Sequence, residues 1–149
     1  MVKRLLALCM CLCATAAAAS AGERPKLAPA DEYFGHLKMS VLGIANVLRD
    51  SRLRAADPMR SDSIFGSLAW VEDAIRDWES KYPEDTWIAK DLLALETTYL
   101  TAPGGHAHDC ALRTEAWLRH DYANTTYAVL GHNALLRVGY TDDGSATSP

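Results

Sequence analysis

The chain has 149 residues, with 15 Lys and Arg against 19 Asp and Glu, which gives a formal net charge of −4 at neutral pH. This length is enough for one domain with an ordinary hydrophobic core. The acidic balance argues against nucleic acid or an anionic membrane surface as a partner.

The first 21 residues have the three zones of a secretory signal peptide. Lys3 and Arg4 precede an apolar run over residues 5–14, and small residues that allow cleavage follow near Ala19–Ala21. The apolar run is much shorter than the roughly 20 residues that a membrane span needs. We therefore expect a protein that does not span a membrane and is periplasmic or secreted, with a net charge of −6 once the first 21 residues are removed.

The spacing of apolar residues predicts the fold class. After a Pro-containing linker at residues 22–30, apolar residues recur three and four positions apart over residues 31–140, and no stretch alternates convincingly with the two-residue period of a strand. The polar tail at residues 141–149 lacks a core-forming residue and is expected to be disordered. The sequence therefore predicts a single all-α domain of about five helices.

The first helix is predicted to run from an N-cap at Asp31 to about Ala55. Gly35 and Gly43 lie eight positions apart, nearly on one face, where we expect them to let a neighbouring helix come close. The following segment, residues 49–60, is rich in Arg and Asp. It could bind an anion, but a solvated helix end is the favoured interpretation, because cations there complement the helix dipole.

The second helix has the clearest amphipathic pattern and is predicted to start after a cap at Ser61 or Ser63. Its apolar stripe consists of Ile64, Leu68, Val71, Ile75, Trp78 and Tyr82. Pro83 breaks this helix and is expected to be an early residue of a third helix, which stops at residues 103–105. The third stripe consists of Ile88, Leu92, Leu95 and Tyr99.

Two further helices complete the prediction. The fourth runs from about Ala107 to Asp121, and the fifth from about Thr125 to Val138 with Asn124 as its cap. Most of the tryptophans are expected in the core or between helices. They are Trp70, Trp78, Trp87 and Trp117.

Residues 71–90 and 111–130 match one another at an offset of 40. The aligned pairs are Tyr82 and Tyr122, Thr86 and Thr126, and Trp87 and Tyr127. With Tyr-Pro-Glu-Asp at residues 82–85, this pattern resembles the tetratricopeptide-like repeats of small exported bacterial proteins, over roughly residues 61–138. The resemblance implies helix pairs that present a groove to a protein or peptide. Because the period exceeds the usual repeat of about 34 residues, an irregular helical bundle is the alternative.

The residues most able to bind a metal are His106, His108 and Cys110, with Asp109 between them. Imidazole and thiolate together suit Zn, Cu or Ni. However, two His residues two positions apart chelate one ion only from extended backbone. A solvated helix start, with Cys110 buried and unreactive, is therefore the favoured interpretation, and a metal site is the alternative.

No catalytic motif is present in the chain. Neither a Gly-x-Ser-x-Gly elbow nor a Gly-rich phosphate loop occurs. His120 and Asp121 are neighbours, but we expect them to point in different directions on a helix. The sequence therefore predicts a non-catalytic exported helical module, without a cofactor, that binds a protein or peptide. A periplasmic metal-binding protein is the alternative.

Overall fold

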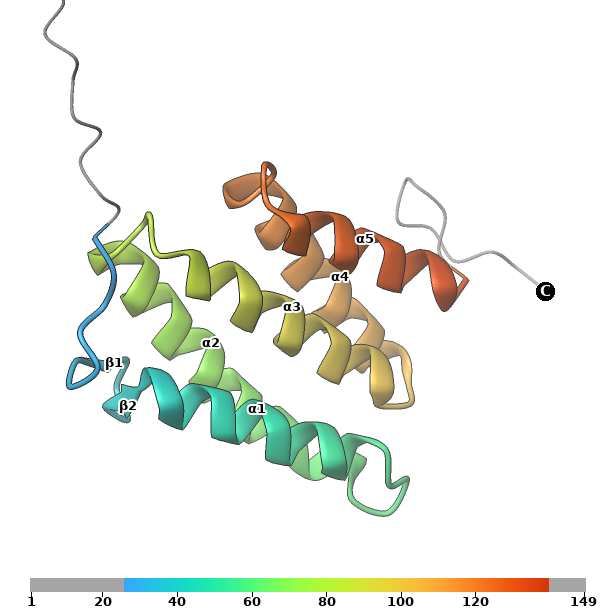
Figure 1. Ribbon diagram of the computed structural model, residues 1–149. Coiled ribbons are helices and arrows are strands. Elements are labelled where there is room, and N and C mark those ends of the chain that lie inside the picture. The colour runs from blue at the N-terminus through green and yellow to red at the C-terminus, as the bar shows by residue number, and fades with distance from the viewer. Residues whose placement is uncertain (1–25, 140–149) are drawn as a thin grey trace, which may run out of the picture.

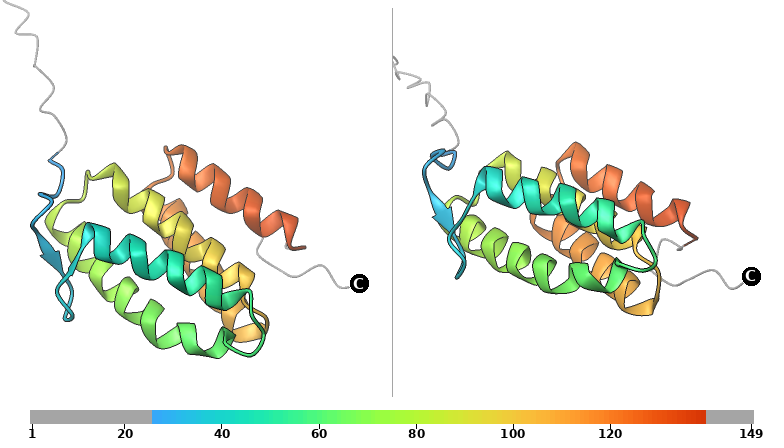
Figure 2. Two further views of the ribbon diagram at one scale, coloured as in Figure 1. Left: turned by 60° about the horizontal axis from the view of Figure 1, so that its bottom comes forward. Right: turned by 90° about the horizontal axis from the view of Figure 1, so that it is seen from below.

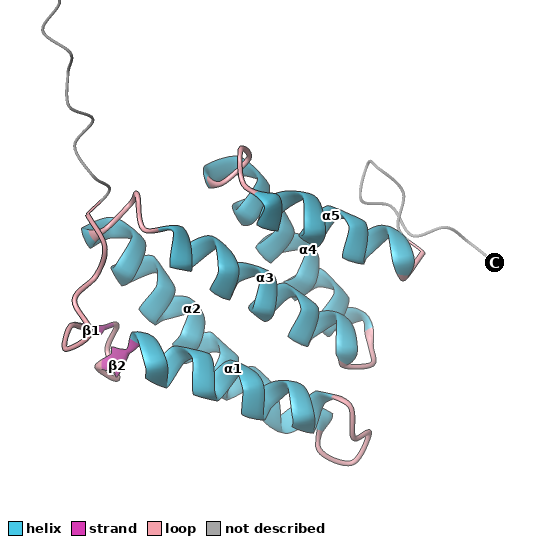
Figure 3. Ribbon diagram, in the orientation of Figure 1, coloured by secondary structure: helices cyan, strands magenta, loops and turns pink. Residues whose placement is uncertain are grey.

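The computed structural model describes residues 26–139, so the predicted signal peptide at residues 1–21 and the predicted tail at residues 141–149 lie outside the described residues. The described elements are β1 (Tyr33–Phe34), β2 (Met39–Ser40), α1 (Val41–Ala55), the 3₁₀ helix η1 (Ser61–Ser63), α2 (Ile64–Lys81), α3 (Thr86–Thr101), α4 (Gly105–Asp121) and α5 (Thr126–Arg137). The prediction of an all-α fold of about five helices is confirmed, with a short hairpin added at its start (Figure 1 and Figure 3).

The helices alternate in direction, and α3 lies in the middle. Helices α1, α3 and α5 run one way while α2 and α4 run the other (Figure 1 and Figure 2). Helix α3 packs against each of the other four. The two predicted apolar stripes, on α2 and α3, are buried as expected. None of the helices in the described range is long and apolar enough to cross a membrane.

The predicted start of the first helix at Asp31 is wrong. Helix α1 begins at Val41 and is capped by Ser40, whose Oγ accepts a hydrogen bond from Gly43 N at 3.1 Å. Before it, β1 and β2 pair antiparallel, with Tyr33 opposite Ser40. This hairpin replaces the expected first turns of helix.

Carboxylates of α2 hold the hairpin turn in place. Asp77 accepts a hydrogen bond from Gly35 N at 2.9 Å, and Asp73 accepts one from His36 N at 2.7 Å. The adjacent Phe34 is fully buried, and its ring stacks on that of Trp78 with 5.4 Å between centroids. In a helix, the backbone N–H groups of Gly35 and His36 would donate to carbonyls of the same helix. Here they donate to side chains about 40 residues further along the chain.

The two glycines predicted to allow a close helix approach behave differently. Gly35 does approach α2, where an added Cβ would lie 2.9 Å from Ala74 Cα, but it does so from the hairpin turn. At Gly43, an added Cβ would meet Ser40 of its own chain segment and no neighbouring helix. The expectation is therefore wrong for Gly43. Gly35 does allow a close approach to α2, as expected, but it lies in the hairpin turn and not in a helix.

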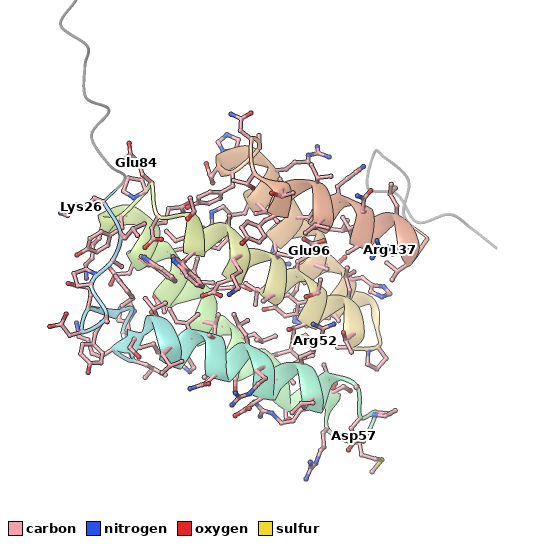
Figure 4. The ribbon with its side chains drawn as sticks, in the orientation of Figure 1. Lys26, Arg52, Asp57, Glu84, Glu96 and Arg137 are labelled. Carbon is pink, nitrogen blue, oxygen red and sulfur yellow. The ribbon has the colours of Figure 1, made fainter. Side chains whose placement is uncertain are left out.

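Helix α1 ends in the Arg-rich segment, which is solvated as expected. Arg49 and Asp50 form an exposed ion pair at 3.4 Å, and Arg60 and Asp57 form another at 3.9 Å. Figure 4 labels Arg52 and Asp57 near this end of the molecule. Pairs of this kind contribute little to stability, about 0 to 1 kcal/mol each.

Three other predicted boundaries are corrected. Helix α3 begins at Thr86 after an Asp85 cap, so Pro83 stands in the turn and is not a helix residue. Helix α5 is capped by Thr125, one residue after the predicted Asn124, because the Thr125 hydroxyl accepts a hydrogen bond from Ala128 N. Helix α4 begins at Gly105, two residues earlier than predicted.

The internal match at an offset of 40 corresponds to two turns with the same backbone hydrogen bonds. Tyr82 N donates to Trp78 O at 2.8 Å, and Tyr122 N donates to Leu118 O at 3.0 Å. The cap residues Asp85 and Thr125 each donate a backbone N–H to the tyrosine carbonyl, at 3.0 Å in both turns. The two turns lie side by side and together line a surface pocket of about 290 Å³.

Candidate functional site

A cavity of about 460 Å³ lies where the N-terminal segment, the start of α1 and the start of α3 meet. We call it the α1–α3 cavity. Its walls include Leu27 and Ala30 before the hairpin, Val41 and Leu42 on α1, and Trp87, Lys90 and Asp91 on α3, and the buried Trp78 and Asp85 also line it. The volume is in the range of ligand-binding pockets, about 300 to 1,000 Å³, and most of the lining is apolar.

Asp85 accepts hydrogen bonds from three parts of the chain and so holds the walls of the cavity together. Its Oδ1 accepts a hydrogen bond from Trp87 N at 3.0 Å, which caps α3. Its Oδ2 accepts from Trp78 Nε1 at 3.1 Å and from Ala28 N at 2.9 Å. The Asp85 side chain is 1% exposed, so these donors replace the water that a carboxylate otherwise needs.

Asp91 is the second carboxylate of the cavity, and its environment differs. It lies one turn after Trp87 on α3 and is 6% exposed. Burial raises its pKa from 3.8 to about 6, although the charge of Lys90 opposes this increase, and the charge of Asp85 adds to it. No residue in the described range donates a hydrogen bond to the Asp91 carboxylate.

The rim of the cavity is apolar and exposed. Leu27 is 50% exposed, Leu42 is 69% exposed and Trp87 is 50% exposed. Lys90 lies over the Trp87 ring, with its Nζ 4.4 Å from the ring centroid, a cation–π contact. Trp87 is therefore a surface residue of the cavity and not a core residue.

The expected burial of the tryptophans is right for two of the four. Trp78 is fully buried and Trp117 is half-buried between helices, where its Nε1 donates to the Glu79 carboxylate at 3.1 Å. Trp70 and Trp87 are 45% and 50% exposed, so the expectation is wrong for both.

The three predicted metal-binding residues are not brought together as a set, although two of them lie close to each other. His106 Nε2 lies 3.9 Å from Cys110 Sγ, but the His106 ring also packs against Phe65, with 4.7 Å between centroids. Arg113 donates a hydrogen bond to Cys110 Sγ at 3.3 Å. Because α4 begins at Gly105, His106 and His108 are both helical and lie on different sides of it. Residues 26–139 contain no group of three or more side chains placed to hold a metal ion.

Two other expectations concern Cys110 and the His120–Asp121 pair. Cys110 is buried, with 3% of its surface exposed, as expected. His120 Nδ1 and Asp121 Oδ1 lie 2.7 Å apart, so the expectation that these neighbours point in different directions is wrong. They lie at the last turn of α4, where both residues are exposed.

A second group of buried acids lies among α3, α4 and α5. Glu96 on α3 is fully buried, and both of its carboxylate oxygens lack a hydrogen-bond partner among the described residues. Figure 4 labels Glu96 inside the bundle. On α4, Glu115 Oε1 lies 3.5 Å from Arg119 Nη1 and 3.5 Å from His132 Nδ1. Burial, and secondarily the charge of Glu115, raises the Glu96 pKa from 4.5 to about 8.

The Glu96 carboxylate occupies the space that a side chain at Gly131 of α5 would take. A Cβ added at Gly131 would overlap Glu96 Oε2 and would lie 3.1 Å from Leu118 Cδ2. Alanine normally stabilises a helix by about 1 kcal/mol relative to glycine. We expect Gly131→Ala to destabilise the protein instead, by about 1 to 2 kcal/mol in denaturant unfolding, because a buried side chain must move.

The matched control for this prediction is Gly66→Ala on α2, where an added Cβ meets nothing within 4 Å. It should stabilise the protein by about 0.5 to 1 kcal/mol. A stabilising Gly131→Ala would show that Glu96 does not occupy this space. In a Glu96→Ala background, most of the cost of Gly131→Ala should disappear, because only the 3.1 Å approach to Leu118 Cδ2 remains.

Comparison of the chain with protein-family models, curated proteins and solved structures gave no match.

Proposed function

We propose that this protein is a non-catalytic exported helical module that binds a segment of another protein at the α1–α3 cavity. One observation carries the proposal. Leu27, Leu42 and Trp87 come from three separate parts of the chain, and they stand half exposed or more around a single cavity. Exposed apolar groups that gather around a cavity are typical of binding sites.

The exposure of the rim favours a protein segment over a small molecule. A ligand that only fills about 460 Å³ would leave the outer part of Leu42, which is 69% exposed, in water. A protein segment that crosses the rim would also cover Leu27 and Trp87. Each Å² of apolar surface removed from water contributes about 25 cal/mol.

The apolar lining of the cavity and the pattern of helix pairs support a binding role. The two helix pairs with matching turns are also consistent with the proposed tetratricopeptide-like arrangement, since stacked helical repeats present extended binding surfaces. Export is proposed from the signal-peptide pattern at residues 1–21.

The test uses peptides selected from a random display library against the purified protein. Dissociation constants of the selected peptides are then measured for the wild type and for Leu42→Ser and Trp87→Ala. We expect each substitution to weaken binding at least about tenfold, which corresponds to about 1.4 kcal/mol. Both side chains are exposed, so circular dichroism and the thermal midpoint should change little.

Leu53→Ser is the matched control. Leu53 also lies on α1 and is 72% exposed, but it does not line the cavity. Binding by this variant should equal that of the wild type. If no selected peptide distinguishes Leu42→Ser or Trp87→Ala from Leu53→Ser, the α1–α3 cavity is not the binding site.

A further inference from the structure

Of the two carboxylates in the α1–α3 cavity, Asp91 has far more acceptor capacity to offer a ligand. Asp85 already accepts hydrogen bonds from Trp87 N, Trp78 Nε1 and Ala28 N. Asp91 lines the same cavity and is more than nine-tenths buried, yet it accepts none from any described residue. A buried carboxylate without donors costs free energy, which a ligand that donates to it would recover.

The cation whose charge acts on Asp91, Lys90, does not pair with it. Lys90 precedes Asp91 on α3, but its Nζ lies over the Trp87 ring at the rim. No ion pair within residues 26–139 includes Asp91. The other groups that line the cavity from the N-terminal segment and from α1 are Leu27, Ala28, Ala30, Val41, Leu42 and Ala45, which carry no charge.

We infer that the protein segment bound at the α1–α3 cavity inserts a Lys or Arg side chain whose cationic end pairs with Asp91. This inference rests on the proposed function and specifies its ligand.

The shape and charge of the cavity suit such a side chain. Lys and Arg have long aliphatic stems, which pack against apolar walls such as Val41, Leu42 and Trp87 while the charged end reaches a polar partner. A neutral apolar side chain would fill the same space but would leave the Asp91 carboxylate unpaired. An acidic side chain would be repelled by both Asp91 and Asp85. The net negative charge of the chain also attracts basic partners.

Binding should therefore depend on pH. In the free protein the pKa of Asp91 is raised to about 6, mainly by burial. A cation pairs with the ionised carboxylate, so affinity for a basic peptide should be greatest above about pH 7 and should decline as the pH falls through about 6. A peptide without the basic residue should show no such decline from this group.

The experiment compares two peptides on two forms of the protein. The tightest peptide from the display selection is synthesised with its basic residue and again with norleucine, which keeps the aliphatic stem and lacks the charge. Both are titrated against the wild type and Asp91→Asn. The wild type should prefer the basic peptide at least about tenfold, and Asp91→Asn should lose most of that preference.

Asp62→Asn provides the control for a change of net charge, because Asp62 is exposed in η1 and does not line the cavity. It should retain the preference of the wild type. If the selected peptides lack a basic residue, or if norleucine binds as tightly as lysine while Trp87→Ala still weakens binding, the cavity binds peptides and the inference about Asp91 is wrong. If Trp87→Ala and Leu42→Ser have no effect on any peptide, the proposed function itself fails.

Discussion

We expect the protein to lose stability as the pH rises from about 5 to about 8, and Glu96→Gln to abolish most of that loss. The folded protein keeps a proton on Glu96 up to a pKa of about 8, whereas the unfolded chain releases it near 4.5. Between these values unfolding releases a proton, so a rising pH favours the unfolded state. The effect is on the order of 3 to 5 kcal/mol in the free energy of unfolding.

Structure explains the size of this effect. The Glu96 side chain is fully buried, both oxygens lack donors among the described residues, and Glu115 is a second acid nearby. Ionised Glu96 would therefore be an unpaired buried charge. Gln has nearly the same shape and does not titrate, which isolates the charge from the packing.

Urea unfolding of the wild type and Glu96→Gln in buffers across this pH range is the measurement. Asp91→Asn serves as the comparison, because the raised pKa of Asp91, about 6 against 3.8, makes stability fall between those two values only. It should flatten the lower part of the profile and leave the part above about pH 6 unchanged. Parallel losses in the wild type and Glu96→Gln would show that Glu96 is not the group responsible.

The second large effect is expected for Gly35→Ala, which should destabilise the protein by about 3 kcal/mol. Gly35 has a φ of +68°, which costs a residue with a Cβ about 1 to 2 kcal/mol. The added Cβ would also lie 2.6 Å from Asp73 Oδ2 and 2.9 Å from Ala74 Cα. The backbone of α2 cannot move aside, so the turn must shift and its hydrogen bonds to Asp73 and Asp77 must lengthen.

Gly104→Ala tests backbone strain without a steric contact. Gly104 also has a positive φ, +99°, but nothing lies within 4 Å of a Cβ added there. Its ψ of +154° places it in a region that essentially only glycine adopts, so thermal or urea unfolding should give a loss of about 1 to 3 kcal/mol. If Gly35→Ala costs no more than the strain of its positive φ, about 1 to 2 kcal/mol, the contact with Ala74 has no energetic consequence.

The helices of the core could be predicted because their signal is local. Ile64, Leu68, Val71, Ile75 and Trp78 repeat at helical spacing, and all of them are fully buried on α2. A strand or loop would place these residues on several faces. For the same reason the ends of α2 and α4 could be located from Tyr82 and Tyr122.

The hairpin could not be predicted in this way. Phe34, Leu37 and Val41 have the three- and four-residue spacing of a helix, although Leu37 is 56% exposed in the turn. What determines the conformation is the pair of hydrogen bonds from Gly35 and His36 to α2. Contacts between residues this far apart leave no periodic trace in the local sequence.

The candidate site was also missed, although one signal of it was present. Asp91 and Glu96 stand beside the apolar stripe of α3, at positions that face other helices. Acids at buried positions are unusual and often mark functional sites. The cavity around Asp91, however, depends on the hydrogen bond from Ala28 N to Asp85, which joins residues 57 positions apart. The sequence alone does not reveal such a contact.

The three hydrogen bonds of Asp85 imply an uneven tolerance to mutation around the cavity. Leu27 and Ala30 line it with side chains that lie outside the core, so substitutions there change the shape presented to a ligand without a loss of core packing. Position 85 has no such freedom, since an apolar replacement removes the acceptors of Ala28, Trp78 and Trp87 at once, and Asn keeps only one of the two acceptor oxygens. Substitutions in the chain segment that precedes the helices can therefore change ligand preference, while the Asp85 carboxylate maintains the cavity itself.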